Sequence, residues 1–317
     1  MLILVTGGKG LVGSAINKRY KLNSHSYSNI EWVFLSSKDC DLTKIDQVDH
    51  LFNSFKPDVI IHLAAKVAGL YGNMANNYSM LSDNLKINGN ILDACKKYKV
   101  KRLINILSTC IFPDQNIVYP LTSDQILKGP PHFSNEGYAY SKRLLYVGSK
   151  ILSQETNTEV VNLTPTNLYG ENDNYNLLNS HVIPGLIHKC YIANKQHNNL
   201  FVKGSGKAKR QFLYANDFAD IILEFVTLPL SNKFNTLIVS PPSYNEMSIS
   251  ELVNHITNEL DFKKLVVYNS DPDGQINKTC DDSELYQFLP DFEFTPFNKG
   301  LEETITYFKK HYKSIRK

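Results

Sequence analysis

The stretch that most constrains the fold is VTGGKGLVG, in which Gly7, Gly10 and Gly13 are spaced three residues apart. It completes the short apolar run LILVT and leads into the amphipathic segment LVGSAINKRY. Glycines at this spacing allow a sharp turn and let backbone N–H groups approach a pyrophosphate, which the positive end of the following helix also attracts. Because this strand–turn–helix context is what the motif requires, the stretch predicts a dinucleotide-binding loop.

Short apolar runs alternate with helix-length segments through the first half of the chain. The runs EWVFLS, DVIIHLAA, RLINIL and TEVVNLTP are separated by segments such as IDQVDHLFNSF and AYSKRLLYVGSKILSQ. This alternation predicts βαβ units and a parallel sheet, and runs that are apolar throughout indicate that helices cover both faces. We therefore expect an α/β fold with a Rossmann-type, doubly wound parallel sheet.

The regular alternation ends near Tyr169, where the stretch GENDNYN begins. We expect residues 1–168 to form an NADP-binding Rossmann domain, to which some later segments return. Residues 169–317 should form mainly a smaller C-terminal substrate-binding lobe. Within that lobe, Ser248 and Glu251 in SISEL form a capping-box pattern, which predicts a helix that runs to about Leu260.

Composition and charge exclude several classes of protein. The chain has 42% hydrophobic and 21% charged residues and a net charge of +3, without long basic runs, so we expect no nucleic-acid partner. Its five cysteines are irregularly spaced, which predicts neither a disulfide framework nor a metal site. The apolar run at the start is too short for a secretory signal, and no stretch approaches the roughly 18 apolar residues of a membrane span. We expect a cytoplasmic protein with reduced thiols.

The residues after the second predicted strand bear on cofactor choice. NAD sites usually place an acid there, which accepts from the ribose hydroxyls and repels a 2′-phosphate. This chain has Ser36, Ser37 and Lys38 at that place, followed by Asp39, and Lys9 lies in the glycine loop. Two hydroxyls and a cation favour a phosphate ligand, so the pattern favours NADP over NAD.

The segment GYAYSKR places Tyr138 and Lys142 four residues apart, on one face of a predicted helix. A ketone that accepts a hydride also needs a proton on its oxygen. An ordinary phenol, with a pKa of about 10, is too weakly acidic to exchange protons rapidly at neutral pH. A nearby ammonium would lower that pKa. Ser108, after the strand RLINIL, would bind the substrate carbonyl and complete a triad with Tyr138 and Lys142.

Cys110 lies two residues beyond Ser108, close to the carbons beside a ketone bound there. A thiol can exchange protons at carbon α to a carbonyl, and this exchange is epimerisation chemistry. Inversion needs a second acid or base on the opposite face, and His181 in SHVIPGLIHK is suited to that role. Taken singly, Cys110 would be interpreted as a small buried residue and His181 as a capping or surface residue.

These motifs occur together in one known family. In order, TGGKGLVG, HLAAKVAGL, STCIFP, GYAYSKR, PTNLYGENDN, SHVIPGLIHK, GSGKAKRQFLY and DGQINK closely resemble the GDP-L-fucose synthases, which are extended short-chain dehydrogenases/reductases. The resemblance covers nearly the whole chain, with departures at Val202-Lys203-Gly204 and at Glu171-Asn172. It implies epimerisation of GDP-4-keto-6-deoxymannose at carbons 3 and 5, reduction of carbon 4 by NADPH, and a homodimer built on two helices of each Rossmann domain.

The resemblance also implies roles for individual residues. Ser108, Tyr138 and Lys142 match the reductive triad, Cys110 the epimerisation base and His181 the opposing acid, while Lys9 matches the residue that binds the 2′-phosphate. The expected cofactor contacts are Gly7, Lys9, Gly10, Leu11, Val12, Gly13, Ser36, Ser37, Lys38, Leu63, Ala64, Ala65, Tyr138 and Lys142. The expected contacts with the GDP-sugar are Asn167, His181, Lys189, Arg210, Asp273 and Lys278.

Three alternatives remain open from the residues alone. A nucleotide-sugar 4,6-dehydratase would normally carry a carboxylate beside the active-site hydroxyl, where this chain has Thr109 and Cys110. A 4-epimerase needs no Cys/His pair and usually retains NAD. A non-catalytic NADP-binding regulator would need the glycine loop but not the triad.

Overall fold

A central parallel sheet organises the molecule, which is seen here in a computed structural model that describes residues 1–271 and 273–317. Six strands lie in the order β10-β5-β4-β3-β1-β2, and every neighbouring pair is parallel. They are β1 (Leu2–Thr6), β2 (Glu31–Phe34), β3 (Val59–His62), β4 (Arg102–Ile106), β5 (Glu159–Pro165) and β10 (Phe234–Val239). The predicted Rossmann-type sheet is confirmed.

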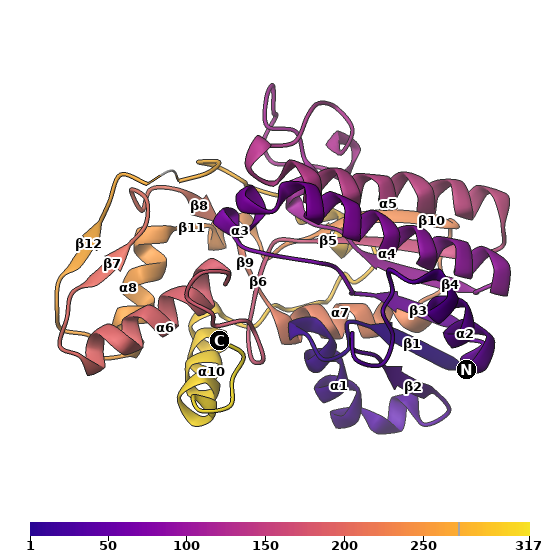
Figure 1. The fold of residues 1–317 in the computed structure, drawn as a ribbon, viewed down its shortest axis with the longest axis horizontal. Helices are drawn as coiled ribbons and strands as arrows, with labels where there is room; N and C mark the ends of the chain where they lie inside the picture. The colour runs from indigo at the N-terminus through magenta and orange to yellow at the C-terminus, as the bar shows by residue number, and fades with distance from the viewer. Residues whose placement is uncertain (272) are drawn as a thin grey trace.

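Helices cover both faces of this sheet, which explains why its strands are apolar throughout (Figure 1). On β1, Ile3 and Val5 pack in one core cluster while Leu4 packs in another on the opposite face. One layer contains α1 (Leu11–Leu22) and α7 (Ala215–Thr227), and the other contains α2 (Ile45–Phe55), α4 (Asn77–Tyr98) and α5 (Glu136–Glu155).

The C-terminal lobe lies to one side of the sheet, at the left of Figure 1. Its strands form three small pairs: β6 (Asn167–Tyr169) with β9 (Phe212–Tyr214), β7 (Leu200–Val202) with β12 (Val266–Tyr268), and β8 (Lys209–Arg210) with β11 (Met247–Ser248). Its helices are α6 (Val182–Lys195), α8 (Ile249–Glu259) and α10 (Phe297–His311). The predicted capping box of Ser248 and Glu251 is present at the start of α8.

Two segments beyond residue 168 belong to the sheet layers. Strand β10 pairs with β5 at the sheet edge, and α7 packs against α1. The remaining elements are short: α3 (Leu70–Ala75), α9 (Ser283–Tyr286) and 3₁₀ turns at Ser24–Tyr27, Thr109–Ile111, Ser123–Gln125, Phe133–Asn135 and Ser243–Asn245. Among the described residues, no helix is both long and apolar enough to cross a membrane.

The strand order creates a crevice at the carboxyl ends of the inner strands β1 and β3. Strand β2 lies on one side of β1, and β3 lies on its other side. The connections that follow β1 and β3 therefore leave the carboxyl ends of these strands in opposite directions. Ligands of doubly wound sheets bind at this point. The two loops are close together where they leave their strands, since a side chain at Gly7 would lie 3.0 Å from the Ala64 backbone nitrogen.

Candidate active site

A cleft of about 1360 Å³ runs from this crevice to the C-terminal lobe. Almost every residue predicted above to contact cofactor or substrate lines it, although these residues are scattered over more than 270 positions of the chain. Those lining the cleft are Gly7, Lys9, Gly10, Leu11, Val12, Gly13, Ser36, Ser37, Leu63, Ala64, Ala65, Ser108, Cys110, Tyr138, Lys142, Asn167, His181, Lys189, Arg210, Asp273 and Lys278. The exception is Lys38.

The glycine loop forms the floor of the cofactor end. Gly7 has a φ of +69°, which side-chain-bearing residues rarely adopt. A Cβ on Gly13 would lie 2.5 Å from the Cα of Gly8, so only glycine lets α1 start this close to the loop. The helix begins at Leu11 with no side chain capping its first N–H groups. The residues of this first turn line the cleft, and the free N–H groups of a helix start suit a pyrophosphate.

The loop after β2 differs from the prediction in two respects. The Ser36 hydroxyl donates to Asp39 Oδ2 at 2.6 Å, and the Ser36 N–H donates to the same oxygen at 2.8 Å. Lys38 is exposed and lies outside the cleft lining. The reason is local: the Asp39 carboxylate folds back onto Ser36 and closes a tight turn, which leaves Lys38 on its outer side. The Lys9 ammonium is near this carboxylate and helps to lower the pKa of Asp39.

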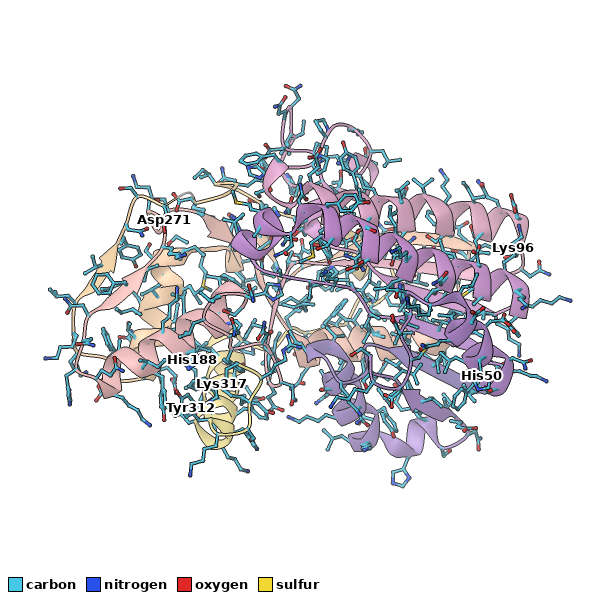
Figure 2. The ribbon with its side chains drawn as sticks, viewed as in Figure 1. His50, Lys96, His188, Asp271, Tyr312 and Lys317 are labelled. Carbon is cyan, nitrogen blue, oxygen red and sulfur yellow. The ribbon has the colours of Figure 1, made fainter. Side chains whose placement is uncertain are left out.

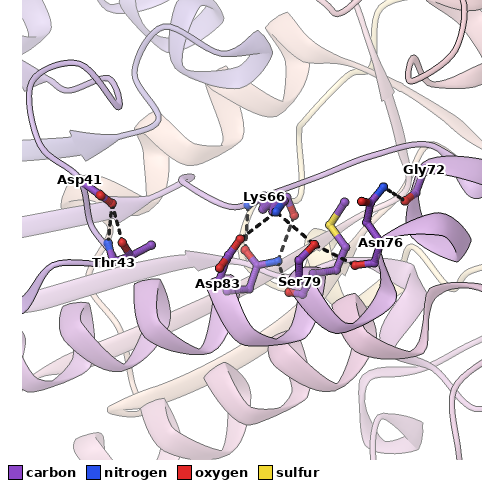
Figure 3. A network of polar contacts seen from close by, with 9 residues as sticks. Asp41, Thr43, Lys66, Gly72, Asn76, Ser79 and Asp83 are labelled. Atoms are coloured by element: carbon purple, nitrogen blue, oxygen red, sulfur yellow. Dashed lines mark hydrogen bonds and ion pairs between the residues drawn. The ribbon is translucent and has the colours of Figure 1, made fainter.

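A polar network lines the wall of the cofactor end (Figure 3). Lys66, four residues beyond His62 of β3, donates to Asp83 at 2.8 Å and to Ser79 at 3.1 Å, both on α4. Its backbone N–H donates to the Asn84 side chain at 2.8 Å. These bonds hold the loop after β3 against α4. They therefore fix the wall formed by Leu63–Ala65.

The predicted triad comes together at the centre of the cleft. Ser108 follows β4, and its side chain caps the 3₁₀ turn by accepting the Cys110 N–H at 3.3 Å. Tyr138 and Lys142 project from α5, and a hydrogen bond between Ser108 and Tyr138 favours the phenolate. Burial and the nearby Cys110 outweigh that bond and raise the pKa of Tyr138.

Lys142 is not among the groups that shift the pKa of Tyr138 in this structure, so the expected lowering by its ammonium stays a prediction. The Lys142 ammonium donates to the Ile106 carbonyl at 2.7 Å, and burial lowers the pKa of Lys142 to about 8. The cation is directed at a backbone oxygen of β4. A protonated phenol is the form that can donate a proton to a ketone.

A buried hydrogen-bond chain positions the helix that carries the triad. The Asn88 amide on α4 donates to the Ser141 carbonyl on α5 at 3.1 Å, and its oxygen lies 3.1 Å from His62 Nε2. The other ring nitrogen of His62 lies 3.0 Å from the Thr6 hydroxyl. Burial lowers the pKa of His62 to about 3, so the imidazole is neutral. These hydrogen bonds join β1, β3, α4 and α5 and so hold in place the helix that carries Lys142.

Cys110 and His181 line the same cleft, whereas His188 does not. Cys110 is partly exposed, and His181 is exposed at the N-cap of α6. His188, one heptad further along α6, is instead buried against α10, where its ring nitrogens lie 2.6 Å from the Tyr175 carbonyl and 3.3 Å from the Tyr312 hydroxyl (Figure 2). His181 is thus the histidine of this pair that is open to a ligand.

The substrate end of the cleft is rich in cations. Burial lowers the pKa of Lys189, as does the neighbouring Lys203. Arg210 donates to the Lys209 carbonyl at 2.6 Å. The Asp273 carboxylate is engaged within the lobe, because its two oxygens accept the Ser205 N–H and hydroxyl at 2.7 and 2.6 Å.

Several cleft residues were missed by the sequence reasoning. Lys66, Lys203 and Arg316 add cations to the lining, and Asp173 adds an acid that is only 4% exposed. One oxygen of Asp173 accepts the Asn174 N–H at 2.7 Å, and the other has no hydrogen-bond partner. The position of Lys66 just after β3 is a signal that could have identified it. The others lie in irregular segments, where no periodicity indicates which way a side chain points.

Comparison with known proteins agrees with this geometry. The sequence profile of the NAD dependent epimerase/dehydratase family matches residues 3–236. The chain belongs to this family. A GDP-L-fucose synthase from Dictyostelium discoideum is 42% identical to this chain, and the match covers 99% of this chain and 97% of the relative. A probable GDP-L-fucose synthase from Drosophila melanogaster is 36% identical over 99% of each chain.

A solved structure extends the likeness to three dimensions. A GDP-L-fucose synthetase from Naegleria fowleri, bound to NADP, has a TM-score of 0.90 and 38% identity, covering 100% of this chain and 95% of its own. The resemblance that the sequence motifs carried is therefore confirmed over the full length of this epimerase/dehydratase family member.

Proposed function

We propose that this protein converts GDP-4-keto-6-deoxy-D-mannose to GDP-L-fucose, by epimerisation at carbons 3 and 5 and NADPH-dependent reduction of the 4-keto group. The observation that carries the proposal is that one cleft contains both Cys110 with His181 and Ser108 with Tyr138 and Lys142. The first pair suits epimerisation and the triad suits ketone reduction. The relatives named as GDP-L-fucose synthases support the same product.

In the epimerisation, Cys110 acts as the base and His181 as the acid. The sulfur takes the proton from carbon 3 or 5, and the electrons of the broken C–H bond move to the carbonyl oxygen, which Ser108 and Tyr138 stabilise. His181 then delivers a proton to the opposite face. Each inversion is redox-neutral, and the thiol and imidazole regain their starting states through water.

In the reduction, the same oxygen receives its proton from Tyr138. Bound NADPH supplies the hydride for carbon 4. Tyr138 suits the donor role because its side chain lines the cleft and its hydroxyl bonds to Ser108, which would bind the carbonyl. A 4,6-dehydratase is disfavoured, because Thr109 and Cys110 offer no carboxylate beside Ser108.

The GDP diphosphate binds the cations at the lobe end. Arg210 and Lys189 come from different elements, β8 and α6, and both line this end of the cleft. Asn167 also lines it, with its amide donating to the Gln211 carbonyl at 3.1 Å. Two separated cations suit the spread charge of a diphosphate. Asp273 contributes indirectly, by holding the loop at Ser205.

The decisive assay supplies GDP-4-keto-6-deoxy-D-mannose and NADPH and determines the configuration of the product. GDP-L-fucose is the expected product, and NMR should show that its carbons 3 and 5 are inverted relative to the substrate. A 6-deoxy sugar with unchanged configuration at these carbons would identify a simple 4-reductase. No NADPH consumption would favour a regulator instead.

Replacing Lys9 tests the preference for NADPH. We expect Lys9→Met to raise the KM for NADPH about tenfold, since one charge-assisted phosphate contact is lost, and to leave the KM for NADH unchanged. Lys38→Met is the matched control, because that lysine lies outside the cleft. Equal effects of Lys9→Met on both cofactors would contradict this role, and steady-state kinetics with each cofactor measures the difference.

We further propose a homodimer formed through α4 and α5. These helices lie side by side along one edge of the molecule (Figure 1). On α5, Tyr140, Leu144 and Ile151 follow helical spacing along one face, and the two aliphatic side chains are 51% and 47% exposed. A second copy that packs the same face here would bury an apolar stripe that otherwise contacts water.

A charge in this stripe should separate the subunits. We expect Leu144→Glu to convert the dimer to a monomer at micromolar concentration, because it buries an unpaired carboxylate at the interface. Leu22→Glu is the matched control, since Leu22 is also exposed but ends α1. Analytical ultracentrifugation measures the mass. A Leu144→Glu dimer, or a monomeric unmodified protein, would refute this interface.

We also propose a cytoplasmic location. All five cysteines are free, which suits a reducing compartment.

A further inference from the structure

Lys278 contacts the proposed epimerisation base directly. Its ammonium lies 3.8 Å from Cys110 Sγ in hydrogen-bond geometry, although the two residues are 168 positions apart. The resemblance assigned Lys278 to the substrate. In the structure, its ammonium is directed at the Cys110 sulfur.

The backbone on both sides of Lys278 is anchored, so this contact does not depend on a loose loop. On one side, the Asn277 carbonyl accepts the Tyr119 hydroxyl at 2.8 Å. On the other, the Thr279 carbonyl accepts the Leu121 N–H at 2.8 Å. The next residue, Cys280, donates its N–H to the Gln211 side chain at 2.7 Å. These bonds place Lys278 opposite the 3₁₀ turn that carries Cys110.

Two cationic side chains lie near the sulfur. Besides Lys278, the Arg210 guanidinium is close enough to interact electrostatically with Cys110. Arg210, however, donates to the carbonyls of Lys209 and Ile276, at 2.6 and 3.4 Å. Its hydrogen bonds are thus directed at backbone, while the Lys278 ammonium is directed at the thiol.

We propose that Lys278 is the charge partner that holds Cys110 as a thiolate in the resting enzyme. The thiolate is the form that can accept a proton from carbon. When it does so, the S–H bond forms as the C–H bond breaks, and the thiol must release that proton to water before it acts again. Lys278 favours that release at each cycle. The catalytic consequence rests on the proposed function, but the ion pair itself does not.

The test is the rate at which iodoacetamide alkylates Cys110 in the protein without substrate or cofactor. This reagent reacts with thiolates, and because it is uncharged, loss of a lysine does not change its attraction to the cleft. We expect Lys278→Met to slow alkylation about tenfold at fixed neutral pH, through loss of a close opposite charge. Lys278→Arg should restore most of the rate. Mass spectrometry of the Cys110 peptide gives the rate constant.

Two controls separate this effect from damage to the fold. Cys190 and Cys280 are buried, so both should stay unmodified in every variant that is folded. Lys207→Met removes an exposed lysine of the same lobe that does not line the cleft, and it should leave alkylation of Cys110 unchanged. If Lys278→Met exposes the buried cysteines, the rates of Lys278→Arg and Lys278→Gln decide instead.

The outcomes distinguish this inference from the proposed function. Unchanged alkylation in Lys278→Met, or in Lys278→Gln where that variant decides, would overturn it and leave Lys278 to the substrate alone. A slower rate in Arg210→Met but not in the Lys278 variants would also overturn it, by assigning the charge to Arg210. If the Lys278 effect is found but no GDP-L-fucose forms, the ion pair stands and the proposed reaction fails.

Discussion

Cys110→Ser should abolish proton exchange at carbons 3 and 5 of the substrate and leave NADPH binding intact. The serine hydroxyl has nearly the same size but holds its proton far more strongly than a thiol, so it cannot act as a base at neutral pH. General-base catalysis typically contributes about 10²–10⁴-fold, and we expect a loss of that order. Deuterium incorporation from heavy water, measured by mass spectrometry, reports the exchange.

The buried cysteines supply a matched control for this variant. Cys190 lies in the core of the C-terminal lobe, where burial raises the pKa of its thiol to about 12. Cys190→Ala should therefore retain exchange, apart from any loss of stability. Undiminished deuterium incorporation in a folded Cys110→Ser protein would refute the assignment of the base.

Tyr138→Phe should have the complementary effect, stopping NADPH oxidation while exchange continues. The change removes a single oxygen, the one that donates the proton to the alkoxide formed at carbon 4. Ser108 remains to polarise the carbonyl, so deuterium should still enter carbons 3 and 5, and the epimerised 4-keto sugar should accumulate. NADPH absorbance follows the reduction, for which we expect a loss of about 10²–10⁴-fold.

The control for this variant lies two residues further along α5. Tyr140 is partly exposed, with the Arg143 guanidinium 5.6 Å from its ring centre, and it does not line the cleft. Tyr140→Phe should oxidise NADPH at the normal rate. If NADPH consumption survived in Tyr138→Phe, the proton donor would have to be another group.

The two variants together separate the half-reactions that share this cleft. Loss of exchange with retained cofactor binding, and loss of reduction with retained exchange, would show that Cys110 and Tyr138 act on one bound sugar at different stages. A simple reductase predicts no exchange in either protein. A regulator predicts neither reaction.

Local patterns along the chain were sufficient to predict the sheet, its covering helices and most of the cleft. Alternating apolar runs and amphipathic segments report burial at each position, and the glycine loop requires one backbone path whatever surrounds it. The pair Tyr138 and Lys142 could be placed because four residues are about one helical turn. The capping box at Ser248 could be predicted for the same reason, since its bonds join residues three apart.

The packing of distant segments decided what these groups do to one another. Lys142 bonds to the Ile106 carbonyl at the end of β4, 36 positions away in the chain. Lys38 is the exception, because it lies outside the cleft for a local reason, the bond between Ser36 and Asp39. Lys278 reaches Cys110 across 168 positions, through backbone bonds to the loop at Leu121. Periodicity predicts which face a side chain lies on, whereas its partner in an irregular segment depends on loops whose course only the folded chain determines.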